Sequence, residues 1–347
     1  MKKFFGTSVN VGRLLAAMVL VLVMASTVKA ATPTTIVQFG TTLSDIGYKV
    51  ATDQAGNIYV AGDTKGNTNF GFISQTQDGF LRKMTSTGVL LWQISIGTPA
   101  YDEIRGLAVD RSGNAYVCGS TQGSFGSGFG GYDMFLAKVS PSGQILWLDQ
   151  SGTALEDYAQ SLTLDENGNV YLCGWTMGCM DGVRNPKIYR DAIVMKYSPS
   201  GYRLWARQFN NYYGNNFAYG ITCYEGKLFV TGLNGLPGLC NTGGPGNLLL
   251  YVFDLNGSKL WGKSLGGENT TGKAIAVDGN GIYITGFAIS PFDGNNYYGG
   301  YRNTILVKFD LNGIKQWSRE WGMGYWDEGN GIVLDSLGNA YVVGNTK

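Results

Sequence analysis

Short apolar runs recur along most of the chain, and polar segments that contain glycine separate them. Between residues 106 and 150 the runs read GLAVD, AYVCGST, MFLAKVS and QILWLDQ. Runs of this length, rich in β-branched and aromatic residues, are too short for ordinary helices and favour strands. VDRSGN separates the first two runs and SPSG the last two, and both are typical turn sequences. We therefore predict four antiparallel strands in this stretch.

The same pattern repeats about every 56 residues, since five tryptophans follow one another at gaps of 55, 58, 56 and 56: Trp92, Trp147, Trp205, Trp261 and Trp317. The segment GNIYVAG at Gly56 recurs in six copies, which start at Gly56, Gly113, Gly168, Gly226, Gly281 and Gly338. We divide the chain into units at residues 41–97, 98–152, 153–210, 211–266, 267–322 and, as a partial unit, 323–347.

The predicted strands are apolar on both faces, so each sheet must be covered on both sides. Stacking the four-stranded sheets in a ring achieves this, and the predicted fold class is an all-β β-propeller with six visible units. A sandwich is the alternative, but nothing in a sandwich calls for a tryptophan every 56 residues or so.

The stretch YDMFLAKVSPSGQILWLDQSGTALEDYAQSLTLDENGNVYLCGWT, from Tyr132 to Thr176, resembles the SBBP family, the seven-bladed β-propeller repeat of exported bacterial and archaeal proteins. The resemblance extends over roughly everything after Thr34. It implies the fold and export, and no established activity. DLNGSKLW, from Asp254, is more weakly similar to quinoprotein-type propeller repeats.

The two ends of the repeat region are irregular. TTIVQFG, residues 34–40, aligns with the fourth run of later units, so we expect it to supply an outer strand to the last blade and close the ring. The last unit has only two of its runs before Lys347. We expect the chain to be a fragment of a larger propeller, with blade number and any later sorting, anchoring or catalytic module open.

Residues 1–30 have the order of a secretory signal: Lys2, Lys3 and Arg13, an apolar run from Leu14 to Ala25, then small residues. Without the four basic residues of this segment, 22 remain against 25 acids, a charge of about −3 for residues 31–347. We expect an exported protein, periplasmic, extracellular or on the cell surface, that is monomeric, not inserted in the membrane and not bound to nucleic acid.

The chain has no histidine, which excludes Ser-His and Cys-His catalysis and histidine-ligated metals. An enzyme would need a carboxylate pair, and the candidates are Asp102–Glu103, Glu156–Asp157 and Asp327–Glu328. These occupy repeated positions, whereas an active site is normally one asymmetric constellation. We predict a non-catalytic protein without a cofactor.

Acidic residues also recur where strands begin, at Asp45, Asp102, Asp157 and Asp327, with Asn216 and Thr270 in the remaining units. We expect these side chains to cap turns by accepting bonds from nearby amides. The alternative is a calcium site formed by a ring of carboxylates. A second set in register, Lys83, Lys138, Lys196 and Lys308, is expected at blade surfaces or between blades.

The connections between second and third runs are long and variable, and in an up-and-down sheet they share one face with the connections between blades. NNYYG occurs twice on this face, at residues 210–214 and 295–299. The aromatic residues there would suit a glycan, a peptide or a protein surface: Tyr212, Tyr213, Tyr297, Tyr298 and Tyr301. Alternatively, the pentapeptide only reflects the composition of polar loops.

Cys118, Cys173 and Cys223 replace apolar strand residues and are expected to be buried. Cys179 and Cys240 lie in corresponding loops of adjacent units and are the one candidate disulfide. Three functions stay open: a binding or surface-display module acting through the long-loop face, a structural spacer of a larger surface protein, and a carboxylate-based carbohydrate-active enzyme. We favour the binding module.

Overall fold

A computed structural model describes residues 37–66, 76–126, 128–182, 189–209, 214–235, 246–265, 269–292, 294 and 301–346. Within these residues the regular secondary structure is entirely β, from β1 to β22. Five sheets have four strands and a sixth has two. Within each sheet, strands that follow one another in the sequence are hydrogen-bonded to each other. The predicted fold class, a β-propeller of four-stranded antiparallel sheets, is confirmed.

The first three sheets comprise β1 (Asp45–Thr52), β2 (Ile58–Thr64), β3 (Asp78–Met84) and β4 (Leu90–Ile96); β5 (Asp102–Val109), β6 (Ala115–Thr121), β7 (Asp133–Val139) and β8 (Ile145–Ser151); and β9 (Asp157–Leu164), β10 (Val170–Thr176), β11 (Asp191–Tyr197) and β12 (Arg203–Phe209). The others comprise β13 (Asn216–Tyr224), β14 (Lys227–Gly235), β15 (Gly246–Asp254) and β16 (Lys259–Leu265); β17 (Thr270–Asp278), β18 (Gly281–Ala288), β19 (Asn303–Phe309) and β20 (Lys315–Trp321); and β21 (Glu328–Leu334) with β22 (Ala340–Asn345).

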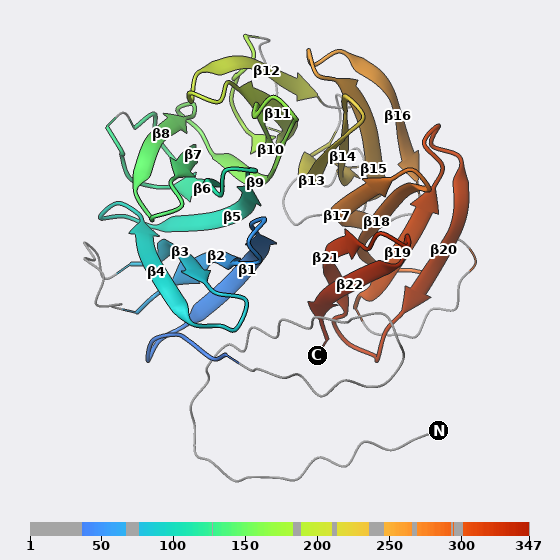
Figure 1. The fold of residues 1–347 in the computed structure, drawn as a ribbon. Helices are drawn as coiled ribbons and strands as arrows, with labels where there is room; N and C mark the ends of the chain where they lie inside the picture. Colours follow the sequence, from blue (N-terminus) through green and yellow to red (C-terminus); the bar gives the residue numbers. More distant parts are fainter. Residues whose placement is uncertain are drawn as a thin grey trace.

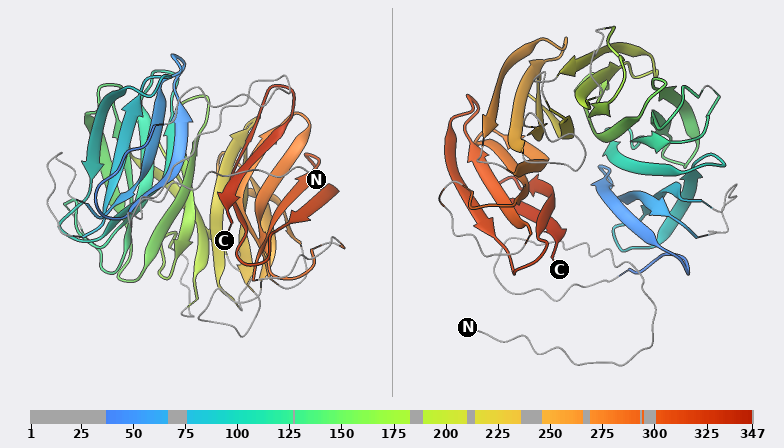
Figure 2. Two further views of the ribbon diagram at one scale, coloured as in Figure 1. Left: turned by 90° about the horizontal axis from the view of Figure 1, so that it is seen from below. Right: turned by 180° about the vertical axis from the view of Figure 1, so that it is seen from behind.

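The sheets follow one another around a central axis (Figure 1). The first strand of each sheet, such as β1 or β5, lies nearest the axis, and the fourth, such as β4 or β8, lies at the perimeter. In the edge-on view the strands run along the axis (Figure 2). The ring therefore has two ends. We call them the turn face, where first joins second and third joins fourth strand, and the long-loop face, where second joins third and sheet joins sheet.

The hydrophobic core lies between neighbouring sheets. Tyr59, Ala61 and Leu81 of the first sheet pack against Val117 and Phe135 of the second, and the same alternation recurs between later sheets. Full burial of one such side chain contributes about 1.5–3 kcal/mol. The two apolar faces of each strand therefore pack against the two neighbouring sheets. The described residues include no helix that is long and apolar enough to cross a membrane.

The expected ring-closing strand at residues 34–40 is not formed in its described part. Residues 37–40 belong to no strand, and Val37 and Phe39 pack instead against an apolar patch of the first sheet, Val60, Phe80 and Met84. An outer strand needs a third strand to bond to, and the described residues of the last sheet contain only β21 and β22. The two apolar side chains therefore cover the face of the first sheet that has no preceding sheet.

Each innermost strand is interrupted by a β-bulge, at its fourth residue in the first five sheets and at its third residue in β21. The residues left out of the register are Tyr48, Arg105, Gln160, Tyr219, Lys273 and Asn330. The last glycine of the GNIYVAG-type segment faces the bulge, and a Cβ at Gly119 would lie 1.7 Å from the carbonyl oxygen of Glu103. The recurring glycine is therefore required by the bulge, and bulges re-aim side chains.

Candidate ligand-binding site

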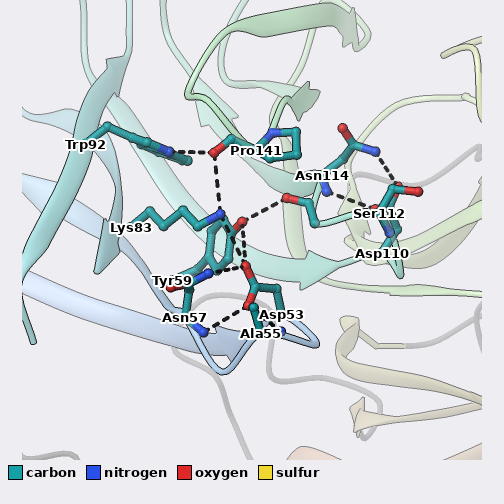
Figure 3. Close-up of polar contacts among 11 residues, drawn as sticks. Asp53, Ala55, Asn57, Tyr59, Lys83, Trp92, Asp110, Ser112, Asn114 and Pro141 are labelled. Atoms are coloured by element: carbon teal, nitrogen blue, oxygen red, sulfur yellow. Dashed lines mark hydrogen bonds and ion pairs between the residues drawn. The ribbon is translucent and has the colours of Figure 1, made fainter. Parts of the chain in front are cut away.

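The turn face carries one polar cluster in repeated form (Figure 3). In the first sheet the Asp53 carboxylate accepts bonds from the amides of Ala55 and Asn57 at 3.1 and 2.9 Å, and Lys83 Nζ lies 3.2 Å from Asp53 Oδ2. Lys83 Nζ also lies 4.8 Å from the Tyr59 ring centroid. Asp53 and Lys83 are almost fully buried, so this ion pair is shielded from solvent.

The same cluster joins adjacent sheets. Trp92 Nε1 and Lys83 Nζ both donate to the carbonyl of Pro141 in the next sheet, at 2.8 and 3.4 Å, and the Tyr59 hydroxyl donates to Gly113 O at 2.8 Å. Figure 3 shows these bonds converging from one sheet onto the turns of the next. The expectation that the recurring lysines lie at blade surfaces or between blades is confirmed for Lys83, and for Lys196, which donates to Leu255 O at 3.1 Å.

The five repeated tryptophans occupy equivalent positions, the third residue of β4, β8, β12, β16 and β20. Four of them contact the aromatic residue of the second strand edge-on or tilted, with centroids 5.9–6.4 Å apart. Trp261 is partly buried and packs against the core cluster that contains Phe229. The prediction of like environments is confirmed, and the repeat on the turn face therefore serves the fold.

The repeated acids at the long-loop face bond to the backbone. Asp45, Asp102 and Asp157 each accept from the amide of a threonine four residues earlier at 2.6 Å, and Asp327 accepts from Met323 N at 2.9 Å. These are the capping bonds that the sequence predicted. No group of three or more histidine, cysteine, aspartate or glutamate residues that could hold a metal ion occurs among the described residues.

The glutamate of each candidate carboxylate pair faces an arginine. Glu103 accepts from Arg105 at 2.7 Å, Glu156 lies 3.6 Å from Arg190, and Glu328 pairs with Arg302. The aspartate of each pair is the capping residue described above. In every candidate pair, one carboxylate therefore forms an ion pair and the other caps a turn.

Four of the five predicted binding tyrosines, Tyr212, Tyr213, Tyr297 and Tyr298, lie outside the described residues. The fifth, Tyr301, lies on the long-loop face before β19 and is 64% exposed. Cys240 is also outside the described residues, so its disulfide with the exposed Cys179 stays a prediction. Cys118 and Cys173 are buried as expected, and Cys223 is half-buried.

Tyr301 belongs to an exposed platform formed with the connection from β20 to β21. The platform consists of Tyr301, Met323, Tyr325 and Trp326; the last three are 85%, 65% and 41% exposed. The amides of Tyr301 and Arg302 donate to Tyr325 O at 2.8 and 3.1 Å, and the Arg302 guanidinium lies 4.2 Å from the Trp326 ring centroid. Backbone bonds and a stacked arginine therefore hold the exposed rings in place.

The platform continues into a belt of aromatic rings along the long-loop end of the sheets. Arg302 lies 4.1 Å from the Phe287 centroid, and Lys273 Nζ lies 5.8 Å from Phe287 and 4.1 Å from Tyr219. From Tyr219 the belt passes through five more rings, and each centroid lies close to the next. The rings are, in order, Phe217, Trp175, Tyr158, Tyr132 and Tyr101, and the five distances between consecutive centroids are 5.6, 5.7, 4.4, 4.6 and 5.8 Å. The belt thus links the second to the sixth sheet.

Sequence reasoning missed this belt because only some of the sheets carry its rings. Tyr158 and Phe217 share the second position of a first strand, where other sheets have residues such as Glu103 and Thr271. The signal available was the bulge position of each first strand, where Arg105 and Lys273, for example, are flanked by glycine and aliphatic residues.

Burial shifts several titratable groups near the axis. It raises the pKa of the Asp63 carboxyl to about 7 and that of the Tyr219 hydroxyl to about 12. Burial, together with the nearby charges of Arg302 and Arg105, lowers the pKa of Lys273 to about 8. At neutral pH the Lys273 ammonium is therefore protonated but poorly solvated.

The sheets, their order around an axis and the repeat define this protein as a β-propeller. The family model SBBP, described as a beta-propeller repeat, matches residues 36–71, 93–126, 147–178 and 316–347. The chain thus carries repeats of this family. No curated protein sequence matches it.

Solved structures similar to this chain are distant in sequence. A protein of unknown function from Bacteroides caccae has 14% identity and a TM-score of 0.45, over 80% of this chain and 82% of that one. XC5397 from Xanthomonas campestris, described as a gluconolactonase, has 12% identity and a TM-score of 0.44, over 83% and 87%. The Neurospora crassa Pan2 WD40 domain has 12% identity and a TM-score of 0.40, over 86% of each chain.

Proposed function

We propose that this β-propeller is a non-catalytic module of an exported protein and that it binds a glycan on its long-loop face. The observation that carries the proposal is the exposed platform of Tyr301, Met323, Tyr325 and Trp326, continued by the aromatic belt. Clustered, exposed apolar side chains are unusual on a soluble protein and mark interaction sites.

The chemistry of the face favours a sugar among the ligands that such a surface accepts. Flat rings offer stacking area to a sugar ring, and the fixed arginine beside them offers hydrogen-bond donors to hydroxyl groups. The Tyr301 and Trp326 centroids are 6.2 Å apart with planes inclined by 40°, so both rings belong to one surface. Because backbone bonds hold the platform, little order needs to be gained on binding.

The alternatives rest on weaker observations. A carbohydrate-active enzyme needs two available carboxyl groups, whereas each candidate pair is engaged in a cap and an ion pair. A structural spacer accounts for the repeated turn face but gives no reason for exposed aromatic residues at the other end.

The test is a glycan array, with a peptide array beside it, probed with the parent chain and with the double variant Tyr301→Ala/Trp326→Ala. Losing two stacking residues should weaken binding by about 1–3 kcal/mol for each ring. Tyr202→Ala is the matched control, because Tyr202 is 73% exposed but lies in the β11–β12 turn on the opposite face.

Glycan binding that is lost in the double variant and kept in Tyr202→Ala supports the proposal. Binding of peptides alone would show that the ligand is a peptide and not a glycan. Unchanged binding in the double variant, or no binding to either array, would contradict the proposed site.

A further inference from the structure

We propose a second binding site at the centre of the ring, where Lys273 takes a carboxylate group of a small organic acid or an acidic sugar. This site lies beside the exposed platform, since Phe287 contacts both Lys273 and Arg302, but it does not use the exposed rings of the platform. The argument rests on how the bulges direct side chains and on the balance of charge around the axis.

The first step is the direction of Lys273. It is the bulge residue of β17, an innermost strand (Figure 1). Its Nζ lies 4.1 Å from the ring centroid of Tyr219, which is the bulge residue of the preceding sheet. Arg105, three sheets earlier, is also a bulge residue, and its charge acts on Lys273. The bulges thus turn groups from different sheets toward one axis.

The second step is the charge. Among the described residues, five basic side chains interact electrostatically with one another or with Tyr219: Lys49, Arg105, Arg190, Lys273 and Arg302. The three arginines pair with Glu103, Glu156 and Glu328. Among the described residues neither lysine forms an ion pair, and the contacts of Lys273 are with the faces of Tyr219 and Phe287. Lys273 is therefore left without an ion-pair partner among the described residues.

The third step is the ligand. Lys273 is half-buried and keeps some solvent-accessible surface, so a small anion can reach it. A poorly solvated ammonium gains from a carboxylate, because a charge-assisted hydrogen bond replaces lost hydration. The Tyr219 face beside it suits a planar carboxylate or a sugar ring that carries one.

The experiment is titration calorimetry of the full chain with glucuronate, with succinate and, as the neutral counterpart, with glucose. We expect the carboxylate ligands to bind and glucose not to bind at the same concentrations. Binding of glucuronate together with succinate indicates a general carboxylate site, whereas binding of glucuronate alone indicates a site for acidic sugars.

Lys273→Met should weaken carboxylate binding by about tenfold or more, and Lys273→Arg should retain most of it. Lys259→Met is the matched control, since Lys259 Nζ also lies over a tyrosine, 3.5 Å from the Tyr251 centroid, but on the perimeter strand β16. Thermal melts show whether each variant folds, and Lys273→Met should be at least as stable as the parent because a desolvated charge is removed.

Absence of carboxylate binding by the parent would overturn the proposal. Equal affinities of the parent and a folded Lys273→Met would also overturn it, as would an equal loss in Lys259→Met. Tyr301→Ala/Trp326→Ala should leave carboxylate binding unchanged, which separates this site from the platform.

Discussion

The two faces of the ring differ in how closely their residues repeat from sheet to sheet. On the turn face, Asp53 with its neighbours is reproduced around Asp110, Asp165 and Asp335 with nearly the same bonds. On the long-loop face the bulge residues differ from sheet to sheet, and aromatic rings replace the residues of other sheets. A part that every sheet repeats serves the stacking of sheets, whereas a part that differs is free to serve recognition.

The largest effect is expected where the repeat is sterically required. Gly119→Ala places a Cβ against Glu103 O and should lower the free energy of unfolding by about 3 kcal/mol, because backbone atoms cannot move away. Urea denaturation measures the change. Gly128→Ala is the control, since its added Cβ would meet no atom closer than Ser124 Cβ at 3.5 Å. Equal stability of the two variants would show that the bulge does not need the glycine.

A smaller loss is expected from the turn cluster. Asp110→Ala removes an acceptor for the amides of Ser112 and Asn114 and for the Asn114 side chain, and should cost about 2 kcal/mol. The exposed neighbour Arg111→Ala should cost little, within about 0.5 kcal/mol. If the two variants had the same denaturation midpoint, the structural role of the cluster would be contradicted.

Stability should also fall as pH rises through the range from about 4 to 7. Burial raises the pKa of Asp63 and Asp78 to about 7 and that of Asp157 to about 6, from 3.8 in the unfolded chain. The folded state then binds more protons than the unfolded state in this window, so its advantage decreases with pH and levels off above it. Melting temperatures at pH 5 and pH 8 test this. Asp63→Asn should reduce the difference, and a higher melting temperature at pH 8 in the parent would refute the expectation.

The smallest effect on stability is expected at the platform. Tyr301→Ala/Trp326→Ala should cost only about 1 kcal/mol, since Tyr301 is 64% and Trp326 41% exposed and both rings lie outside the core between sheets. Melts of this variant beside Asp110→Ala compare the two ends of the ring directly. If the platform variant lost as much stability as Asp110→Ala, the two faces of the ring would not differ in their contribution to stability.

Much of the fold could be predicted because its causes are local and repeated. Turn sequences such as VDRSGN and the tryptophan spacing identify four strands per unit, and apolar residues on both faces require neighbours on both sides. The place of Val37 and Phe39 could not be predicted, because alignment gives a position in the repeat but not a bonding partner.

The site was predicted only in part. Tyr301 was named from a loop motif, but its partners Tyr325 and Trp326 belong to another connection and meet it only through the pairing near β19 and β21. The belt was missed because rings such as Trp175 and Phe217, which lie on strands of adjacent sheets, look like ordinary strand residues until the sheets are stacked. Contacts between sheets depend on how the ring is assembled, which no single repeat records.

The most direct test of the central claim is oxidative footprinting of the full chain with and without the tightest-binding glycan from the array. Met323 and Tyr325 on the long-loop face and Tyr202 on the turn face are all well exposed and oxidise readily when free. We predict that the glycan protects Met323 and Tyr325 and leaves Tyr202 unchanged. Protection of Tyr202 with continued oxidation of Met323 and Tyr325 would contradict the account.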